Sequence, residues 1–234
     1  MRKLADELGG ATVVAADLTE ARAPEQIRDG IETEHGRLDL LVNNAGGSWR
    51  GSFGEAGWAN MERHMKLNFE APLRLTEALL PLLRQTAQTT SRRVSIVNVA
   101  STAARVSRPR AGAYSASKFA LAAWSDALYA EELTHKVHVG LVLPGFVETE
   151  GFPATELKAR ALTRWIVSRP ERVAEAIVEA GPGGKAERYV PRPYWLAAAA
   201  RILAAGLVRR ATAGGAFTTS TGAGQSTTHG RENE

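Results

Sequence analysis

Four short runs of apolar and β-branched residues recur along the chain, separated by stretches with helical periodicity. The runs cover residues 11–17, 38–42, 94–99 and 137–143. Each has the length of a strand, and the run at 94–99 carries no charge, which is typical of a strand buried on both faces. Strands that alternate with helices at this spacing predict a parallel sheet with helices on both sides. We therefore expect a doubly wound α/β fold.

The segments between these runs have the marks of helices. The first predicted helix ends at Gly9-Gly10, and the second begins at Pro24. Pro72 lies inside a long helical region, so we expect a kink or a restart near Asn68. Helices are predicted over residues 1–8, 24–36, 55–83, 113–133, 170–180 and 195–208, and a last short strand over 189–190.

Chain length, composition and net charge limit the class of protein. A chain of 234 residues, 44% hydrophobic and 23% charged, suits one globular domain, which we place at 1–210. Residues 211–234 are rich in Gly, Thr and Ser and are predicted to be a disordered tail. The net charge of +4 is scattered without a basic stripe, so no nucleic-acid partner is expected. The lack of cysteine and of a signal-peptide core favours a cytoplasmic protein.

Three side chains with complementary chemistry are predicted to meet at one edge of the sheet. Ser101 directly follows the strand at 94–99, at the carboxyl end where open α/β sheets place their ligands. Tyr114 and Lys118 lie four residues apart and therefore share one helix face. A hydroxyl, a phenol and an ammonium at one crevice form a candidate acid–base site.

Tyr114 and Lys118 form a Tyr-x-x-x-Lys pair, and other motifs accompany it in a fixed order. Asn43-Asn44-Ala45-Gly46 follows a strand, and Asn68 lies in the next helix. Ser101 precedes Tyr114 by thirteen residues, and Pro144-Gly145 ends a later strand. With the acidic pair Asp17-Leu18, six features covering residues 1 to about 195 resemble the short-chain dehydrogenase/reductase family, which has a Rossmann-like fold.

The resemblance implies hydride transfer between NADP or NAD and a small carbonyl or alcohol substrate, in a homo-oligomer. It implies the catalytic residues Asn68, Ser101, Tyr114 and Lys118. It also implies a cofactor-binding set, consisting of Asp17, Leu18, Asn43, Ala45, Gly46, Tyr114, Lys118, Pro144, Gly145, Val147 and Thr149.

Each catalytic side chain has an expected role. Tyr114 would exchange a proton with the substrate, and a free phenol has a pKa of about 10. Lys118, one helical turn away, is expected to lower that pKa by its positive charge. By resemblance, Lys118 also holds the nicotinamide ribose, and Asn68 holds a water that relays protons to Lys118. Ser101 would hydrogen-bond the substrate oxygen.

The sequence departs from the family at its beginning. The family opens with a strand, a Thr-Gly-x-x-x-Gly-x-Gly turn, a helix and a second strand, and none of these is found here. Both strands belong in the middle of the sheet, so the strand at 11–17 would lack a neighbour and that at 38–42 would be an edge. We expect a wrongly assigned start or a truncated polypeptide. A catalytically inactive fragment that serves as an oligomerisation or regulatory partner, through the Ala-rich helix at 113–133, is the alternative.

Other residues received weaker interpretations. His135 and His138 bracket a strand start without further ligand partners, so no metal site is predicted. Arg105, Arg108 and Arg110 are interpreted as a solvated loop, with an anionic substrate as the alternative. The segment 195–208 is too short and too charged to span a bilayer. Docking on the domain is its default interpretation, and contact with a membrane surface is the alternative.

Overall fold

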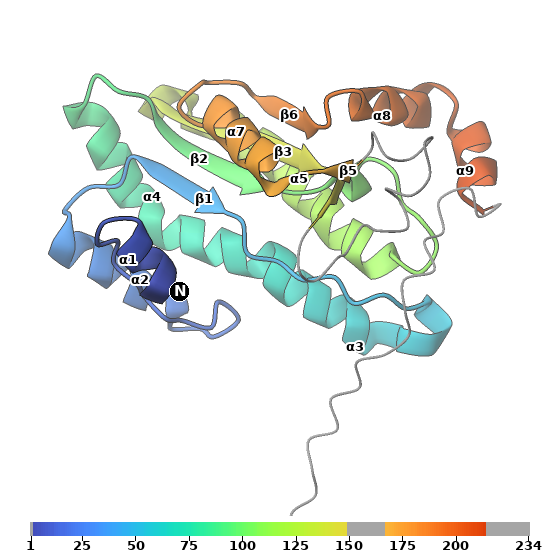
Figure 1. Ribbon diagram of the computed structural model, residues 1–234, viewed down its shortest axis with the longest axis horizontal. Coiled ribbons are helices and arrows are strands. Elements are labelled where there is room, and N and C mark those ends of the chain that lie inside the picture. Colours follow the sequence, from blue (N-terminus) through green and yellow to red (C-terminus); the bar gives the residue numbers. More distant parts are fainter. Residues whose placement is uncertain (1, 149–166, 214–234) are drawn as a thin grey trace, which may run out of the picture.

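The computed structural model describes residues 2–148 and 167–213 (Figure 1). Its main sheet has four parallel strands in the order β1-β2-β3-β6. They are β1 (Leu40–Asn43), β2 (Val94–Val99), β3 (Val137–Pro144) and β6 (Glu187–Val190). Two-residue strands β4 (Phe146–Val147) and β5 (Val167–Ser168) pair separately. The predicted parallel α/β sheet is therefore confirmed.

The helices fall largely where the sequence predicted them. Gly9 and Gly10 end the first in positive-φ conformations. The helices are α1 (Arg2–Glu7), α2 (Ala23–Glu34), α3 (Phe53–Met65), α4 (Ala71–Thr89), α5 (Gly112–Glu132), α7 (Pro170–Ala180), α8 (Tyr194–Leu203) and α9 (Ala205–Ala213), with short turns η1 (Lys66–Glu70), η2 (Thr102–Ala104) and η3 (Leu133–His135). The predicted helix at 195–208 is thus two helices, and residues 211–213 of the predicted tail belong to α9. The rest of that tail lies outside the described residues.

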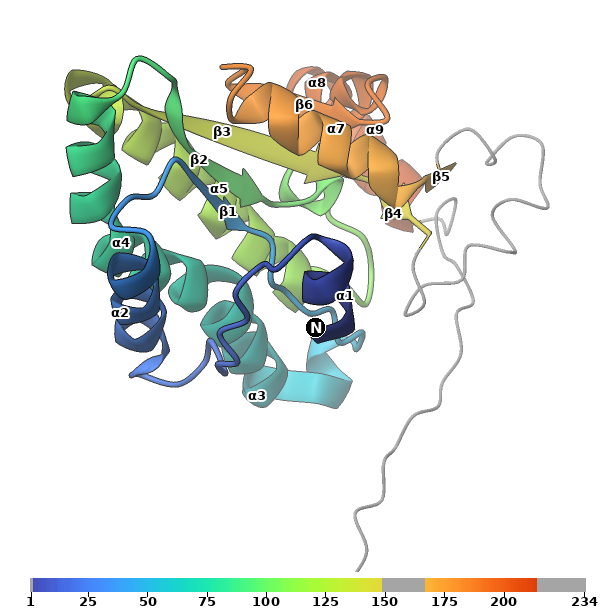
Figure 2. The same cartoon turned by 60° about the vertical axis from the view of Figure 1, so that its left-hand side comes forward.

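Alternate side chains of the strands face opposite layers, as the two-residue period of a strand requires. Val94 and Ile96 pack with Leu79 and Leu83 of α4 and with Leu128 of α5. On the other face, Val97 and Val142 pack with Ala176 and Ala180 of α7. Figures 1 and 2 show α7 on one side of the sheet and α4 and α5 on the other. This sandwich buries β2 and β3 and leaves their carboxyl ends at one edge.

Residues 11–17 form no strand, so that prediction is wrong. Most of their side chains are exposed, and Val13 is 37% exposed. A strand needs hydrogen-bonding partners on a neighbour. No strand in the described part of the chain pairs with this segment. By contrast, β1 is an edge strand as predicted, with β2 as its partner.

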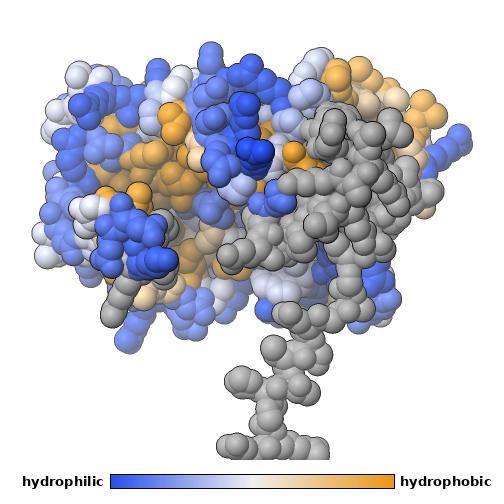
Figure 3. Space-filling model, in the orientation of Figure 1, coloured by the Kyte–Doolittle hydropathy of each residue, from blue (hydrophilic) through white to orange (hydrophobic). Residues whose placement is uncertain are grey.

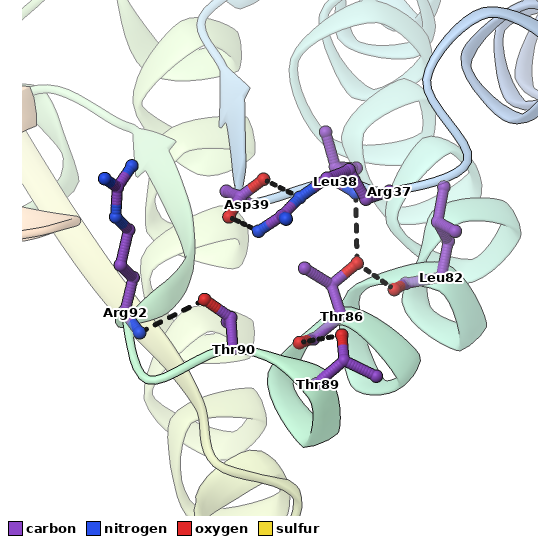
Figure 4. Close-up of polar contacts among 8 residues, drawn as sticks. All are labelled: Arg37, Leu38, Asp39, Leu82, Thr86, Thr89, Thr90 and Arg92. Carbon is purple, nitrogen blue, oxygen red and sulfur yellow. Dashed lines mark hydrogen bonds and ion pairs between the residues drawn. The ribbon is translucent and has the colours of Figure 1, made fainter.

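The edge strand β1 is held at its start by α4 (Figure 4). The Leu38 backbone N–H donates to the buried Thr86 hydroxyl at 3.1 Å, and that hydroxyl donates to the Leu82 carbonyl at 2.8 Å. Arg37 and Asp39 form a two-point ion pair beside it. These contacts fix where β1 begins, and hence where Asn43 and the loop after it lie.

The long helical region is interrupted at Asn68, as predicted. Helices α3 and α4 are joined by one π-helical segment, Lys66–Glu70, and Pro72 lies in the first turn of α4. Proline is tolerated there because the first amides of a helix have no partner inside it. A single π-turn inside an α-helix is frequent at functional sites. Here it carries the buried Asn68.

Candidate active site

The predicted catalytic side chains converge at the carboxyl ends of β1, β2 and β3. Ser101 follows β2, and α5 presents Tyr114 and Lys118 beside it. The π-turn supplies Asn68, and the loop after β1 supplies Gly46. Five residues that are spread over positions 46 to 118 of the sequence therefore lie in one small region.

Asn68 joins three parts of this region. Its Nδ2 donates to the Gly47 carbonyl at 2.9 Å and to the Ser117 hydroxyl at 3.1 Å. Its Oδ1 accepts the Gly47 N–H at 2.8 Å. The amide is completely buried, so these bonds satisfy a group that is costly to leave unpaired. Asn68 therefore positions the loop after β1 against α5.

Lys118 is buried, and its Nζ donates to the Val99 carbonyl at 2.9 Å. Burial lowers the pKa of its ammonium to about 8, because the charged form loses hydration. Gly46 lies close by. A Cβ built on Gly46 would be 3.4 Å from the Lys118 Nζ and 3.0 Å from the Asn68 Oδ1. Glycine lets the loop pass this tight point.

Ser101 links β2 to the turn after β3 and to Tyr114. Its hydroxyl donates to the Pro144 carbonyl at 3.2 Å and accepts the Ala103 N–H at 3.1 Å. Ser101 also lies close enough to the Tyr114 phenol to lower the pKa of that phenol. The serine hydroxyl and the phenol are therefore within reach of one substrate oxygen.

The electrostatics of Tyr114 differ from the expectation. Burial raises the pKa of the phenol, while the Ser101 side chain and the charge of Arg108 lower that pKa. Among the described residues, Arg108 is a cation whose charge lowers the pKa of the phenol. Lys118 Nζ is engaged with the Val99 carbonyl, and its influence on the Tyr114 pKa stays a prediction.

Asn43 belongs to a buried polar chain that crosses the sheet. Its Nδ2 donates to the Thr76 hydroxyl at 3.0 Å and to the Asn98 Oδ1 at 2.8 Å. Asn98 in turn donates to the Ser125 hydroxyl at 2.8 Å. The chain connects β1 and β2 with α4 and α5, so the Asn43 side chain has a structural role here.

The other predicted cofactor residues are spread more widely. Asp17 and Leu18 precede α2. The exposed Asp17 carboxylate accepts hydrogen bonds from the backbone N–H and the hydroxyl of Thr19. Ala45 lies in the loop after β1, Pro144 ends β3, and Val147 is in β4. Gly145 lies against α8, because a Cβ there would be 2.3 Å from the Tyr194 ring. Thr149 lies outside the described residues.

The three loop arginines do not behave as one solvated group. Arg105 forms an ion pair with Glu187 at 3.0 Å, and the exposed Arg110 pairs with Glu55. Arg108 is half-buried with its guanidinium 4.7 Å from the centre of the Phe146 ring, and it forms no ion pair with a carboxylate of the described chain. Of these three arginines, Arg108 is the one whose charge lowers the pKa of the Tyr114 phenol.

The metal prediction concerned His135 and His138. His138 Nε2 hydrogen-bonds the Ala180 carbonyl at 2.8 Å, and its ring packs edge-on against Tyr129. Among residues 2–148 and 167–213, no cluster of three or more potential metal ligands is found.

His64 was not predicted as a site residue, yet it borders Tyr114. It is completely buried, and its Nε2 accepts the Trp49 N–H at 3.0 Å. Its Nδ1 therefore carries the hydrogen and donates to the Asn60 carbonyl at 2.7 Å. Its ring centre is 6.1 Å from that of Tyr114. A lone histidine on a helix gives no signal of this position in sequence.

We predict that His64 makes the fold sensitive to acid. Burial lowers the pKa of His64 below its usual value of about 6.5, so the unfolded chain binds the proton at higher pH than the folded chain. The contribution of the neutral His64 to the free energy of unfolding is then fully present above about pH 6.5 and is lost as the pH is lowered. The free energy of unfolding in urea, measured at neutral and acidic pH, should drop less in His64→Gln than in the parent. The exposed His135→Gln serves as control, and an equal drop in both variants would contradict the prediction.

The sheet and the side chains at its carboxyl edge define a Rossmann-type α/β protein. The sequence model of the short chain dehydrogenase family matches residues 1–159, and the chain belongs to this family. The predicted resemblance is confirmed.

Individual relatives support the same assignment. The chain is 33% identical over 148 residues to 3-ketodihydrosphingosine reductase of Bacteroides thetaiotaomicron, covering 63% of this chain and 53% of that protein. It is 32% identical over 181 residues to fatty acyl-CoA reductase of Acinetobacter baylyi, covering 71% of this chain and 59% of that protein. The chain thus spans about half the length of the curated relatives it matches.

Solved structures with a similar fold are also found. The active-site complex of Pseudomonas aeruginosa RhlG with NADP is similar with a TM-score of 0.69 and 25% identity, over 80% of this chain and 78% of that one. A short-chain dehydrogenase from Streptomyces avermitilis has a TM-score of 0.71 at 24% identity, over 91% of this chain and 82% of that one. The relatives therefore support the family assignment, and the solved structures support the fold.

Proposed function

We propose that this protein takes part in hydride transfer between NADP(H) or NAD(H) and a carbonyl or secondary-alcohol substrate. The observation that carries the proposal is the convergence of Ser101, Tyr114 and Lys118 at the carboxyl end of β2. A phenol that can exchange a proton, beside a hydroxyl that can orient an oxygen, suits carbonyl reduction and alcohol oxidation.

The residues present fit the nicotinamide end of the cofactor. The buried Lys118 ammonium has three N–H donors, and one hydrogen bond to the described chain is found for it. Its remaining donors suit the hydroxyls of a ribose. Gly46 lies beside the Lys118 Nζ, so the loop after β1 would border the same end of the cofactor, and the bound cofactor would supply or accept the hydride. For the pyrophosphate the fit is incomplete, since the chain contains no Thr-Gly-x-x-x-Gly-x-Gly segment.

The protein's own residues would handle the proton. In reduction, the Tyr114 hydroxyl gives its proton to the substrate oxygen as the hydride reaches the carbon, so C=O becomes CH–OH. Ser101 donates a hydrogen bond to the same oxygen and holds it. In the reverse reaction, Tyr114 takes the proton back. Burial raises the pKa of the phenol, and the charge of Arg108 opposes that rise, so Arg108 favours the phenolate that oxidation requires.

Two relatives are named as reductases of a fatty acyl-CoA and of 3-ketodihydrosphingosine. Both names describe long aliphatic compounds. We therefore propose carbonyl compounds with an acyl chain as the first substrates to examine.

The test is carbonyl-dependent oxidation of NADPH or NADH, followed by nicotinamide absorbance, with Ser101→Ala as the variant. Loss of one hydrogen bond to the reacting oxygen is expected to lower kcat roughly 100-fold. Ser107→Ala, an exposed serine of the same loop, should match the parent. Should Ser101→Ala match the parent as well, the role given to this hydroxyl would be refuted. The assay requires a form of the protein that binds cofactor.

A second proposal is self-association through α4 and α5. A groove of about 800 Å³ lies between these helices and is lined in part by Leu73, Leu80 and Trp124. Apolar grooves of this kind suit a partner helix. The same surface would serve the alternative in which the chain is an inactive oligomerisation partner. Light scattering of the parent and of Leu73→Asp tests it, and the variant should have the lower mass.

A further inference from the structure

The helices α8 and α9 turn their large apolar side chains away from the protein. In α8, Tyr194 and the buried Ala198 face the domain. Trp195 and Leu196 are 54% and 55% exposed, and Ile202 and Leu203 are 80% and 85% exposed. An amphipathic helix that merely docks on its own domain buries its large apolar residues. This helix does the reverse.

The second helix extends the same surface. None of the residues of α9 is buried, and Leu207 is 68% exposed. Figures 1 and 2 show both helices beyond the end of β6, at one extremity of the described domain. Figure 3 shows the hydrophobic surface at this extremity, at the upper right. We call Trp195, Leu196, Ile202, Leu203 and Leu207 the α8–α9 patch.

The charged side chains within α8 and α9 have one sign. Residues 193–213 contain Arg201, Arg209 and Arg210 and no Asp or Glu. Arg209 and Arg210 are exposed, and none of the three forms an ion pair within the described part of the chain. A partner that covers the patch therefore needs an apolar surface bordered by negative charge.

We propose that the α8–α9 patch docks on the surface of an anionic lipid membrane. A surface-lying helix buries its apolar face at the boundary between headgroups and acyl chains, while its arginines meet the anionic headgroups. None of the described helices is long and apolar enough to cross a bilayer, so the binding is peripheral. A second copy of this chain is the less favoured occupant, because it would bring the same three arginines into contact.

The position of the patch gives docking a consequence for the site. The Tyr194 ring lies against Gly145, and its hydroxyl hydrogen-bonds the Phe146 backbone. The first residue of α8 is thus attached to the turn after β3, beside Ser101. If the proposed oxidoreductase function holds, docking brings that site to a source of lipophilic substrate. The docking itself does not depend on the activity.

Vesicle flotation of the 234-residue chain tests the proposal, because aggregates sink while bound protein rises. We expect the parent to float with vesicles of phosphatidylcholine and phosphatidylglycerol, more weakly in high salt, and poorly with phosphatidylcholine alone. Ile202→Ser with Leu203→Ser should lower the partition coefficient at least about tenfold, because two apolar side chains leave the lipid. Arg209→Gln with Arg210→Gln should lower it on anionic vesicles.

Matched controls remove similar groups elsewhere. Val178→Ser removes a side chain of α7 that is 58% exposed, and Arg92→Gln with Arg172→Gln removes two charges, so both should float like the parent. Absence of flotation, equal flotation of the patch variant, or equal binding to neutral vesicles would each overturn the proposal. A fall in mass by light scattering on patch substitution, without flotation of the parent, would assign the patch to self-association instead. Circular dichroism confirms that each variant is folded.

Discussion

Replacing Tyr114 by phenylalanine is expected to lower turnover at least about 100-fold, the usual worth of a positioned general acid. The substitution removes one hydroxyl and keeps the ring, which packs edge-on against His64. The lost group is the phenol hydroxyl whose pKa Ser101 and Arg108 lower. Because water cannot take the place of a donor held at the reacting oxygen, the loss should fall on kcat more than on substrate affinity.

The measurement compares kcat and kcat/KM for Tyr114→Phe and the parent in a form that binds cofactor. Tyr129→Phe is the matched control, since Tyr129 is a half-buried tyrosine of the same helix that packs against His138. It should retain parental activity. Near-parental turnover of Tyr114→Phe with a good substrate would remove Tyr114 from the mechanism, provided that the two variants unfold at the same urea concentration.

The 234-residue chain by itself is expected to show no measurable binding of NADH or NADPH. It offers Lys118 and Gly46 to the nicotinamide end, but its sequence contains no Thr-Gly-x-x-x-Gly-x-Gly segment whose amides could hold the pyrophosphate. Hydride transfer requires the reacting atoms to be held at about 3–3.5 Å, which one end of the cofactor alone does not achieve. The open edge of β1 also exposes unpaired backbone groups, so we expect poor solubility.

Calorimetric titration of the purified chain with each nucleotide measures this directly. Micromolar binding by the 234-residue chain would show that other residues hold the pyrophosphate.

Local patterns were sufficient for much of the fold. The strands β2 and β3 and the helix α5 lie within one or two residues of their predicted bounds. All side chains of β2 are buried, as its uncharged apolar run predicts, and α5 buries one of its faces. The break at Asn68 and the edge position of β1 were also predicted, the first from Pro72 and the second from the order of strands in the family.

The same reasoning failed where a partner decides the outcome. Residues 11–17 have the composition of a strand, but a strand exists only when a neighbour accepts its hydrogen bonds, and the described chain provides none. Arg105, Arg108 and Arg110 look alike in sequence. The tertiary structure pairs two of them with Glu187 and Glu55 and leaves the third beside the phenol.

By itself, the sequence determined the class of fold, the order of the motifs and the family, because these depend on composition, periodicity and spacing along the chain. The tertiary structure alone decided which charge acts on Tyr114, how His64 and Asn68 hold the loop after β1, and which way α8 faces. Each of these depends on contacts between residues far apart in the chain, and their burial and electrostatics arise only once the elements pack.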